Sequence, residues 1–292
     1  MRSLLFVPAD SERKLSRAAE TGADALILDL EDAVAPGRKA AARAMARAYL
    51  SAGGAAGPAL YVRINGFDTG LALDDLVGIL PGWPAGIVLP KCADSAMVRE
   101  LDHLLTALEA RDGLPRGRTR ILPLAVESGA ALFTLGGYAG CSARLEALTW
   151  GGEDLMGDIG ATAKHRAEGG YDDVFQTTRA LVLAAAAAAG VSAIDTVYPD
   201  FRDHGGLRDD CRAGRRAGFG GKLAIHPGQV PIINEAYAVT AAEAEWARRG
   251  VAAFTADPAA GVANLEGLMI DKAHLKQARR LLARARDQGG EG

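Results

Sequence analysis

The chain has 292 residues, of which 49% are hydrophobic and 24% charged, with a mean hydropathy of +0.05. This composition excludes an intrinsically disordered protein and fits either two domains or one large α/β barrel. The 33 Lys and Arg residues are balanced by 36 Asp and Glu residues, for a net charge of -3. Without a basic field, neither nucleic acid nor an anionic membrane is expected as a partner.

Cysteine usage and the apolar runs predict the compartment. Cys92, Cys141 and Cys211 lie far apart and form no CxxC pair, which argues against a disulfide framework and a zinc knuckle and favours a reducing environment. The apolar run 4–7 is too short for a signal peptide. The longest run, 180–189, is far below the roughly 20 residues of a membrane helix. We therefore expect a cytoplasmic protein without a membrane segment.

Short apolar segments that end in polar residues alternate with helical segments along the chain. Near-continuous hydrophobicity is typical of parallel strands that are covered on both faces. Periodic segments rich in Ala, Leu, Arg and Glu between them predict helices. The expected strands are 3–9, 23–31, 58–65, 86–91, 120–128, 145–154, 192–199 and 221–227, and the expected helices include 11–21, 37–52, 94–111, 129–140, 171–189 and 206–217.

Eight strand and helix units within about 230 residues match a TIM (β/α)8 barrel better than a doubly wound sheet, which more often has about five to seven strands. We predict that residues 1–230 form a catalytic barrel domain. Helical segments at 228–256, a loop rich in Gly, Pro and Ala at 257–263 and a last helix over 272–287 follow. We expect residues 231–292 to form a C-terminal helical extension.

Charged or polar residues stand at the carboxyl ends of several predicted strands. These ends meet at one rim of a barrel, where active sites are assembled, so the side chains are expected to converge. A dense group of carboxylates at this rim needs a counter-ion. The residues concerned are Asp29, Glu31, Asp32, Arg63, Asn65, Lys91, Glu127, Glu153, Asp154 and His226.

Glu127 and Asp154, on adjacent strands five and six, are the predicted metal ligands. Neither paired cysteines nor an HxxxH spacing is present, which favours oxygen ligands and therefore Mg2+ or Mn2+ over Zn2+. Magnesium takes one or two carboxylates and keeps other positions for water and substrate. Arg63 can grip a substrate carboxylate with two nitrogen atoms, and a structural ion pair with Asp29 or Glu31 is its alternative role.

Nine segments spread over nearly the whole chain form a specific set. They are RSLLFVPADSERK (2–14), GADALILDLEDAV (22–34), YVRIN (61–65), VLPK (88–91), AVESGAAL (125–132), LTWGGEDL (148–155), AIDTVY (193–198), GKLAIHPGQV (221–230) and MID (269–271). Together they resemble the citrate lyase beta-subunit family, which also includes malyl-CoA and citramalyl-CoA lyases. The resemblance implies a β/α barrel with a C-terminal extension, assembled as a homotrimer or hexamer.

The resemblance also implies residue roles. The family's metal-binding Glu and Asp correspond to Glu127 and Asp154, and its carboxylate-binding Arg corresponds to Arg63. It adds Asp271, on an extension that in related lyases reaches over a neighbouring subunit's site and supplies the acid/base group. The alternative role of Asp271 is the N-cap of a helix that begins at Lys272.

The implied reaction is a Mg2+-dependent retro-Claisen cleavage of a malyl-, citramalyl- or citryl-CoA type 3-hydroxyacyl thioester to acetyl-CoA and a 2-oxo acid. In this scheme Asp29, Glu31 and Asp32 order metal-bound waters. Arg13 and Lys14 either pair with coenzyme A phosphates or are solvated helix charges.

Other outcomes at the same site stay open. Water attack on the thioester would make a malyl-CoA or citramalyl-CoA thioesterase, and condensation would make a malate synthase-like enzyme. A citrate lyase beta subunit would act instead on the thioester of an acyl-carrier protein. Ala9 stands where a glycine is common, and residues 266–269 read EGLM where relatives often have DGKM, so the identity of the acyl carrier is open.

Overall fold

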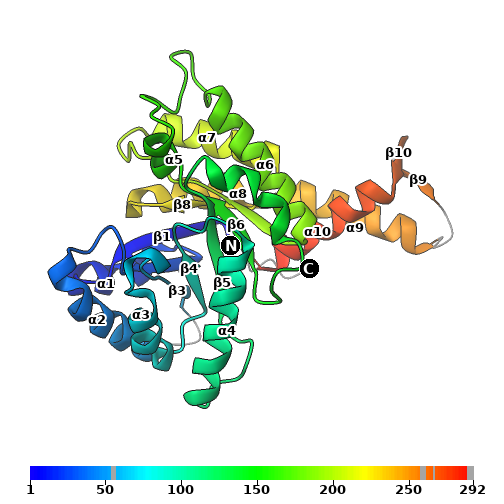
Figure 1. Cartoon of the computed structure of the whole chain (residues 1–292). Coiled ribbons are helices and arrows are strands. Elements are labelled where there is room, and N and C mark those ends of the chain that lie inside the picture. The colour runs from blue at the N-terminus through cyan, green and yellow to red at the C-terminus, as the bar shows by residue number, and fades with distance from the viewer. Residues whose placement is uncertain (54–56, 257–260, 266, 288–292) are drawn as a thin grey trace. The chain divides into compact units, whose positions relative to one another are not determined.

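The computed structural model describes residues 1–53, 57–256, 261–265 and 267–287 (Figure 1). Eight parallel strands close into a barrel in chain order, with β8 paired to β1. This architecture confirms the predicted TIM (β/α)8 fold. The strands are β1 (Ser3–Pro8), β2 (Ala25–Asp29), β3 (Ala59–Arg63), β4 (Gly86–Leu89), β5 (Arg120–Val126), β6 (Ala147–Trp150), β7 (Ser192–Asp195) and β8 (Gly221–Ala224).

The barrel strands are apolar because both of their faces are covered. Every residue of β2, β4, β6 and β8 is buried. One face fills the barrel interior and the other contacts the helices. Parallel register also sets the strand ends side by side, since Asp29 pairs with Arg63 and Arg63 with Val88. The polar residues that follow the strands therefore gather at one rim.

In the described part of the chain, an α-helix follows each barrel strand except β5. Five of these helices lie within or next to predicted helical segments: α1, α2, α4, α6 and α7. The short helices α3 and α5 were not predicted. The predicted helix over 129–140 is wrong, because two 3-10 turns, Ala130–Phe133 and Leu135–Tyr138, stand there. The adjacent Gly136 and Gly137 disfavour a continuous α-helix. The helices are α1 (Glu12–Ala18), α2 (Lys39–Ala52), α3 (Ala72–Ile79), α4 (Ser95–Arg111), α5 (Gly152–Asp158), α6 (Asp173–Ala189), α7 (His204–Ala217) and α8 (Val230–Tyr237).

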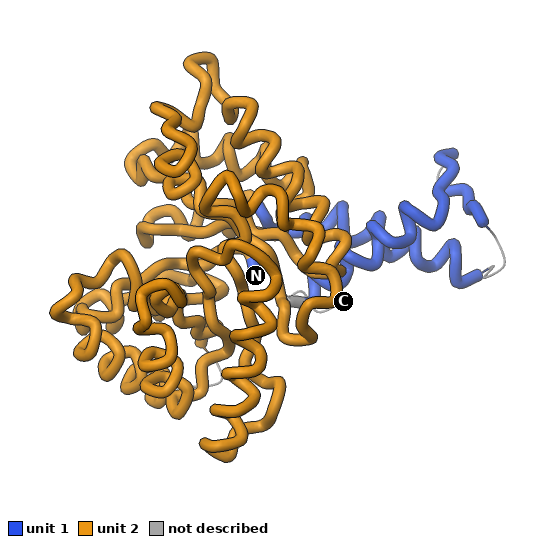
Figure 2. Tube along the Cα trace, viewed as in Figure 1, with its two compact units in different colours: residues 1, 237–292 blue, residues 2–236 orange. Residues whose placement is uncertain are grey.

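The chain divides into two compact units, Arg2–Ala236 and Tyr237–Gly292 with Met1 (Figure 2). In the second unit α9 (Ala241–Ala256) packs against α10 (Lys272–Asp287). An antiparallel hairpin of β9 (Val262–Leu265) and β10 (Leu268–Asp271) precedes α10. The predicted loop over 257–263 is therefore wrong for residues 262–263, and residues 257–260 lie outside the described part of the chain.

No helix within the described ranges is long and apolar enough to cross a membrane.

Candidate active site

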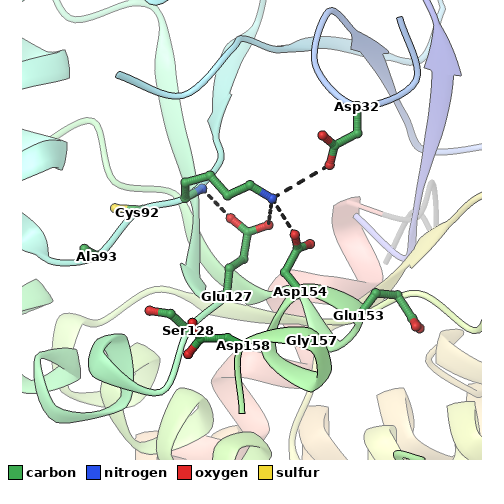
Figure 3. Close-up of a pocket in the computed structure, with 10 residues that line it drawn as sticks. Asp32, Cys92, Ala93, Glu127, Ser128, Glu153, Asp154, Gly157 and Asp158 are labelled. Atoms are coloured by element: carbon green, nitrogen blue, oxygen red, sulfur yellow. Dashed lines mark hydrogen bonds and ion pairs between the residues drawn. The ribbon is translucent and has the colours of Figure 1, made fainter. Parts of the chain in front are cut away.

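A cavity of about 630 Å3 opens where β4, β5 and β6 end (Figure 3). Glu127 directly follows β5 and is only 6% exposed. Asp154 lies in the first turn of α5, just beyond β6, so the predicted strand over 145–154 ends earlier than expected, at Trp150. The lining residues are Asp32, Lys91, Cys92, Ala93, Glu127, Ser128, Glu153, Asp154, Gly157 and Asp158.

The turn after β6 is shaped to seat the Glu127 carboxylate. A Cβ atom on Gly151 would lie 2.8 Å from Cγ and 3.0 Å from Oε1 of Glu127, so any larger residue would displace that side chain. The next residue, Gly152, donates its N–H to Oγ1 of Thr196 over 3.1 Å. These two glycines fix where α5 begins, and with it the position of Asp154.

Lys91 connects the carboxylates of this cavity. Its backbone N–H donates to Glu127, and its ammonium nitrogen lies 2.5 Å from Oδ1 of Asp154. The same nitrogen lies 3.7 Å from Oε1 of Glu127, 3.7 Å from Oε1 of Glu31 and 3.8 Å from Oδ2 of Asp32. In Figure 3 the Asp32, Glu127 and Asp154 carboxylates all point toward one ammonium group. The rim thus holds four carboxylates around one cation.

Burial and mutual charge set the protonation of this group. Burial raises the pKa of Glu127 to about 8, which the charge of Lys91 opposes and that of Asp154 reinforces. Burial likewise raises the pKa of Glu31, although Arg63 opposes the shift. For Lys91 burial opposes the charged form, but the hydrogen bond to Asp154 and the charge of Glu127 raise its pKa above the usual value. Lys91 is therefore a stable ammonium at neutral pH.

Arg63 lies beside this group and binds two carboxylates. Its Nε and Nη2 donate to the two oxygens of Asp29 over 2.8 and 2.7 Å, and Nη1 lies 2.9 Å from Oε2 of Glu31. The guanidinium also lies over the Phe6 ring, 4.6 Å from its centroid. The ion pair considered as the alternative role of Arg63 is thus present. Asp29 is 1% exposed and also accepts the Glu31 N–H, so it positions both Arg63 and Glu31.

The other predicted site residues belong to α1 and to the second unit. Arg13 and Lys14 are exposed on α1, which follows β1. Asp271 belongs to the second unit, at the end of β10 and immediately before α10. Its Oδ1 accepts the backbone N–H groups of Ala273 and His274 and lies 2.7 Å from Nδ1 of His274. Asp271 therefore caps α10, which is the alternative role that the sequence offered.

The donor set suits a hard divalent cation. Within the described ranges, no group of three or more His, Cys, Asp or Glu side chains is arranged as a metal cage. Magnesium does not need one, because one or two carboxylates with water and substrate oxygens complete its octahedral shell. Glu127 and Asp154 already share a cation, the ammonium of Lys91, so their oxygens reach a common point. The two residues fit a magnesium site.

Sequence reasoning placed Lys91 at a strand end but gave it no role. Its signal was the VLPK segment, in which a lysine directly follows an apolar strand and a proline. Lys91 has a φ of 51° and is, with Trp83, one of two non-glycine residues with a positive φ in the described ranges; only the structure reveals it. The close packing of Glu127 against Gly151 could not be predicted from the sequence either, because a single glycine in a turn carries no specific signal.

A closed barrel with carboxylates and cations gathered where its strands end is the architecture of a (β/α)8-barrel enzyme. The chain belongs to the HpcH/HpaI aldolase/citrate lyase family, which matches residues 2–227. The predicted family and enzyme class are thereby confirmed.

Relatives and solved structures match nearly the whole chain. A (3S)-malyl-CoA thioesterase of Cereibacter sphaeroides is 34% identical over 97% of this chain and 94% of its own. Citrate lyase subunit beta of Leuconostoc mesenteroides is 32% identical over 96% of this chain and 92% of its own. The structure of CitE from Mycobacterium tuberculosis in complex with magnesium, acetoacetate and coenzyme A is 32% identical and superposes with a TM-score of 0.74, covering 98% of both chains.

Proposed function

We propose that the chain is a Mg2+-dependent lyase that cleaves a 3-hydroxyacyl-CoA thioester of the malyl, citramalyl or citryl type into acetyl-CoA and a 2-oxo acid. The observation that carries this proposal is the convergence of Glu127 and Asp154 on one cation at the rim of the barrel. The magnesium, acetoacetate and coenzyme A in the related CitE structure support it. A cytoplasmic homo-oligomer, such as a trimer, is part of the same proposal.

The chain's own residues divide the work of binding. Glu127 and Asp154 would hold Mg2+, which when bound polarises the oxygens of a hydroxy acid or 2-oxo acid as a Lewis acid. Glu31 and Asp32 face the same cation position and would order water there. Arg63, held in a fixed plane by Asp29, would orient the substrate carboxylate through its guanidinium edge.

Cleavage requires one proton to move from oxygen to carbon. The substrate hydroxyl loses its proton, the bond between the hydroxyl carbon and the thioester α-carbon breaks, and its electron pair forms the thioester enolate. Protonation of that α-carbon gives acetyl-CoA, while the hydroxyl carbon becomes the carbonyl of the 2-oxo acid. The hydrogen bond from His274 lowers the pKa of Asp271, so this carboxylate is ionised at neutral pH. In our proposal Asp271 accepts the hydroxyl proton and returns it to the enolate.

Thioester hydrolysis is the second candidate, because a relative with this name is 34% identical over nearly the full length. Hydrolysis would use the same cavity but release free coenzyme A and the intact hydroxy acid. Two further alternatives use the same site. One is a malate synthase-like condensation. The other is action on the thioester of an acyl-carrier protein, and the similarity to citrate lyase subunit beta supports this second alternative. Arg13 and Lys14 would pair with coenzyme A phosphates if the free thioester is the substrate.

The test is product analysis with purified protein. Malyl-, citramalyl- and citryl-CoA are incubated with Mg2+, and 2-oxo acid, acetyl-CoA and free coenzyme A are followed together. Equal release of 2-oxo acid and acetyl-CoA, lost with EDTA and in Glu127→Gln and Asp154→Asn, would support the lyase. The exposed Glu100→Gln serves as a matched control that keeps activity. Free coenzyme A without a 2-oxo acid would identify the thioesterase, and no turnover of any CoA thioester would overturn the proposed substrate class.

A further inference from the structure

Lys91 occupies an unusual position for a long cationic side chain. Its ammonium touches Asp154 and lies within 3.8 Å of three other carboxylates, those of Glu31, Asp32 and Glu127. The backbone adopts a φ of 51°, a left-handed conformation that costs energy in a residue with a Cβ atom. The surrounding structure holds this strained backbone at the point where its N–H reaches Glu127.

Two cations cannot share this group of oxygens at contact distance. Mg2+ on Glu127 and Asp154 would lie within a few ångströms of the ammonium nitrogen, and like charges repel strongly at such distances in a partly buried site. The backbone hydrogen bond from Lys91 to Glu127 does not depend on the ammonium, so the side chain can rotate while this bond persists. The cavity of about 630 Å3 that Lys91 lines gives the flexible stem space to move.

The neighbouring cations are fixed more firmly. Arg63 is 13% exposed in its side chain and is bound through all three guanidinium nitrogens to Asp29 and Glu31. The side chain of Lys164 is 5% exposed and is paired with Glu153. The side chain of Lys91, by contrast, is 34% exposed. Of these three cations, Lys91 is the one that faces the cavity and has room to leave the carboxylates.

We propose that Lys91 is an exchangeable internal counter-ion: its ammonium holds the carboxylates of the site before Mg2+ binds, competes with the metal, and turns into the cavity as a cationic contact for the anionic substrate once the metal enters. This inference rests on the proposed function, because it takes Glu127 and Asp154 as the metal ligands. It adds a specificity-determining role for Lys91 that the reaction scheme above does not contain.

The first experiment measures Mg2+ binding by isothermal titration calorimetry at one fixed pH. Lys91→Met keeps the length of the side chain and the backbone N–H but removes the charge, so we expect Mg2+ to bind about tenfold more tightly. Lys91→Arg retains a cation and should bind Mg2+ within about twofold of wild type. Arg116→Met removes one positive charge from the exposed loop before β5, at the opposite end of the barrel, and should not change the affinity.

Two further readouts separate competition from a purely structural role. Without metal, Lys91→Met should melt at a lower temperature than wild type, because its carboxylates lack a counter-ion, and Mg2+ should restore more of its thermal stability. With saturating Mg2+, the same variant should show a raised KM for the anionic substrate. A fold check by circular dichroism in the presence of Mg2+ accompanies both measurements.

Each outcome is decisive. Equal Mg2+ affinity in wild type and Lys91→Met, or weaker affinity in the variant, would overturn the exchange while leaving the metal site intact, provided that Glu127→Gln abolishes binding. Absence of Mg2+ binding in wild type and in Lys91→Met would overturn the proposed metal dependence as well. Tighter binding in Lys91→Met, with an unchanged Lys91→Arg, would support the exchange even if the substrate proves to be a different thioester.

Discussion

The indole N–H of Trp150 donates to Oδ1 of Asp195 over 2.9 Å, and neither residue has any exposed surface. The same Oδ1 accepts the N–H of Thr196, whose hydroxyl in turn accepts the N–H of Gly152. Trp150 ends β6 and Asp195 ends β7, so this chain of hydrogen bonds ties the two strand ends together. It also fixes the start of α5, which carries Asp154.

Thr196→Val should weaken metal binding through this chain. Valine has the same shape but leaves the buried Gly152 N–H without an acceptor, so the turn that positions Asp154 loses its anchor. We expect about tenfold weaker Mg2+ affinity by calorimetry, a loss typical when a group that supports a ligand is removed. Thr196→Ser keeps the hydroxyl and should bind Mg2+ as wild type does. Equal affinity in all three proteins would show that Gly152 needs no such anchor.

Much of the barrel was predictable because its pattern is repeated. Each strand is a short apolar run, such as residues 25–29, and eight repeats of one pattern outweigh an error in any one of them. The helix α5 escaped prediction because it follows β6 after a single glycine, Gly151, and its first residues, 152–154, were included in the predicted strand over 145–154. The hairpin before α10 escaped as well, since only Ile270 among its strand residues is buried and residues 262–265 form no continuous apolar run.

The sequence could predict those residues of the candidate site whose residue type and position at a strand end indicate a role, but not the direction of their side chains. Glu127 and Asp154 could be chosen because carboxylates at adjacent strand ends are a recognisable metal-binding pattern. The ammonium of Lys91 could not be assigned to them, because its direction depends on a left-handed φ that no sequence pattern encodes. Asp29 and Glu31 were predicted as alternative partners of Arg63, yet only the structure shows that both bind it at once.

Arg63→Lys should reduce activity more than stability. Lysine keeps the charge but cannot reproduce the two parallel hydrogen bonds to Asp29, nor the planar edge proposed for the substrate carboxylate. We expect kcat/KM to fall by about a hundredfold or more, with a loss of about 1–3 kcal/mol in the free energy of unfolding.

Asp29→Asn is the matched variant, because it weakens the same ion pair from the other side and leaves the guanidinium in place. We expect a similar loss of stability in chemical denaturation but a smaller loss in steady-state kinetics. If Arg63→Lys loses stability but keeps the wild-type kcat/KM, Arg63 serves the fold and not the substrate.

The buried pair of Glu109 and Arg144 should make stability depend on acid. Burial alone would raise the pKa of Glu109, but hydrogen bonds from Arg144 and from the N–H groups of Thr119 and Gly117 lower it to about 2. A carboxylate whose pKa is lower in the folded state stabilises the fold above its unfolded pKa of roughly 4.5 and loses this contribution as the pH falls toward 2. We expect this contribution to be on the order of 1–3 kcal/mol at neutral pH.

Urea denaturation between pH 7 and pH 2.5 measures this dependence. Wild type should lose stability progressively below about pH 4.5, whereas Glu109→Gln should be less stable at pH 7 and show a shallower decline. Equal acid slopes for the two proteins would assign the decline to other carboxylates.

Two substitutions of Asp271 separate its helix-capping role from its proposed role in proton transfer. Asp271→Asn keeps a side-chain oxygen that can accept the N–H groups of Ala273 and His274, and asparagine caps helices about as well as aspartate. It cannot carry the proton between the hydroxyl and the enolate. We therefore expect kcat to fall by about 10²–10⁴-fold while the melting temperature stays at the wild-type value.

Asp271→Ala removes both functions and is the matched comparison. It should lose the same activity as Asp271→Asn and, in addition, melt at a lower temperature because the cap of α10 is missing. Because the carboxylate is ionised in the free protein, Asp271→Asn should also lose exchange of the acetyl-CoA methyl protons with deuterated solvent, which reports proton transfer without cleavage. Full turnover and exchange in Asp271→Asn, together with a lower melting temperature in Asp271→Ala, would leave the cap as the role of Asp271 and require another proton carrier for the enolate.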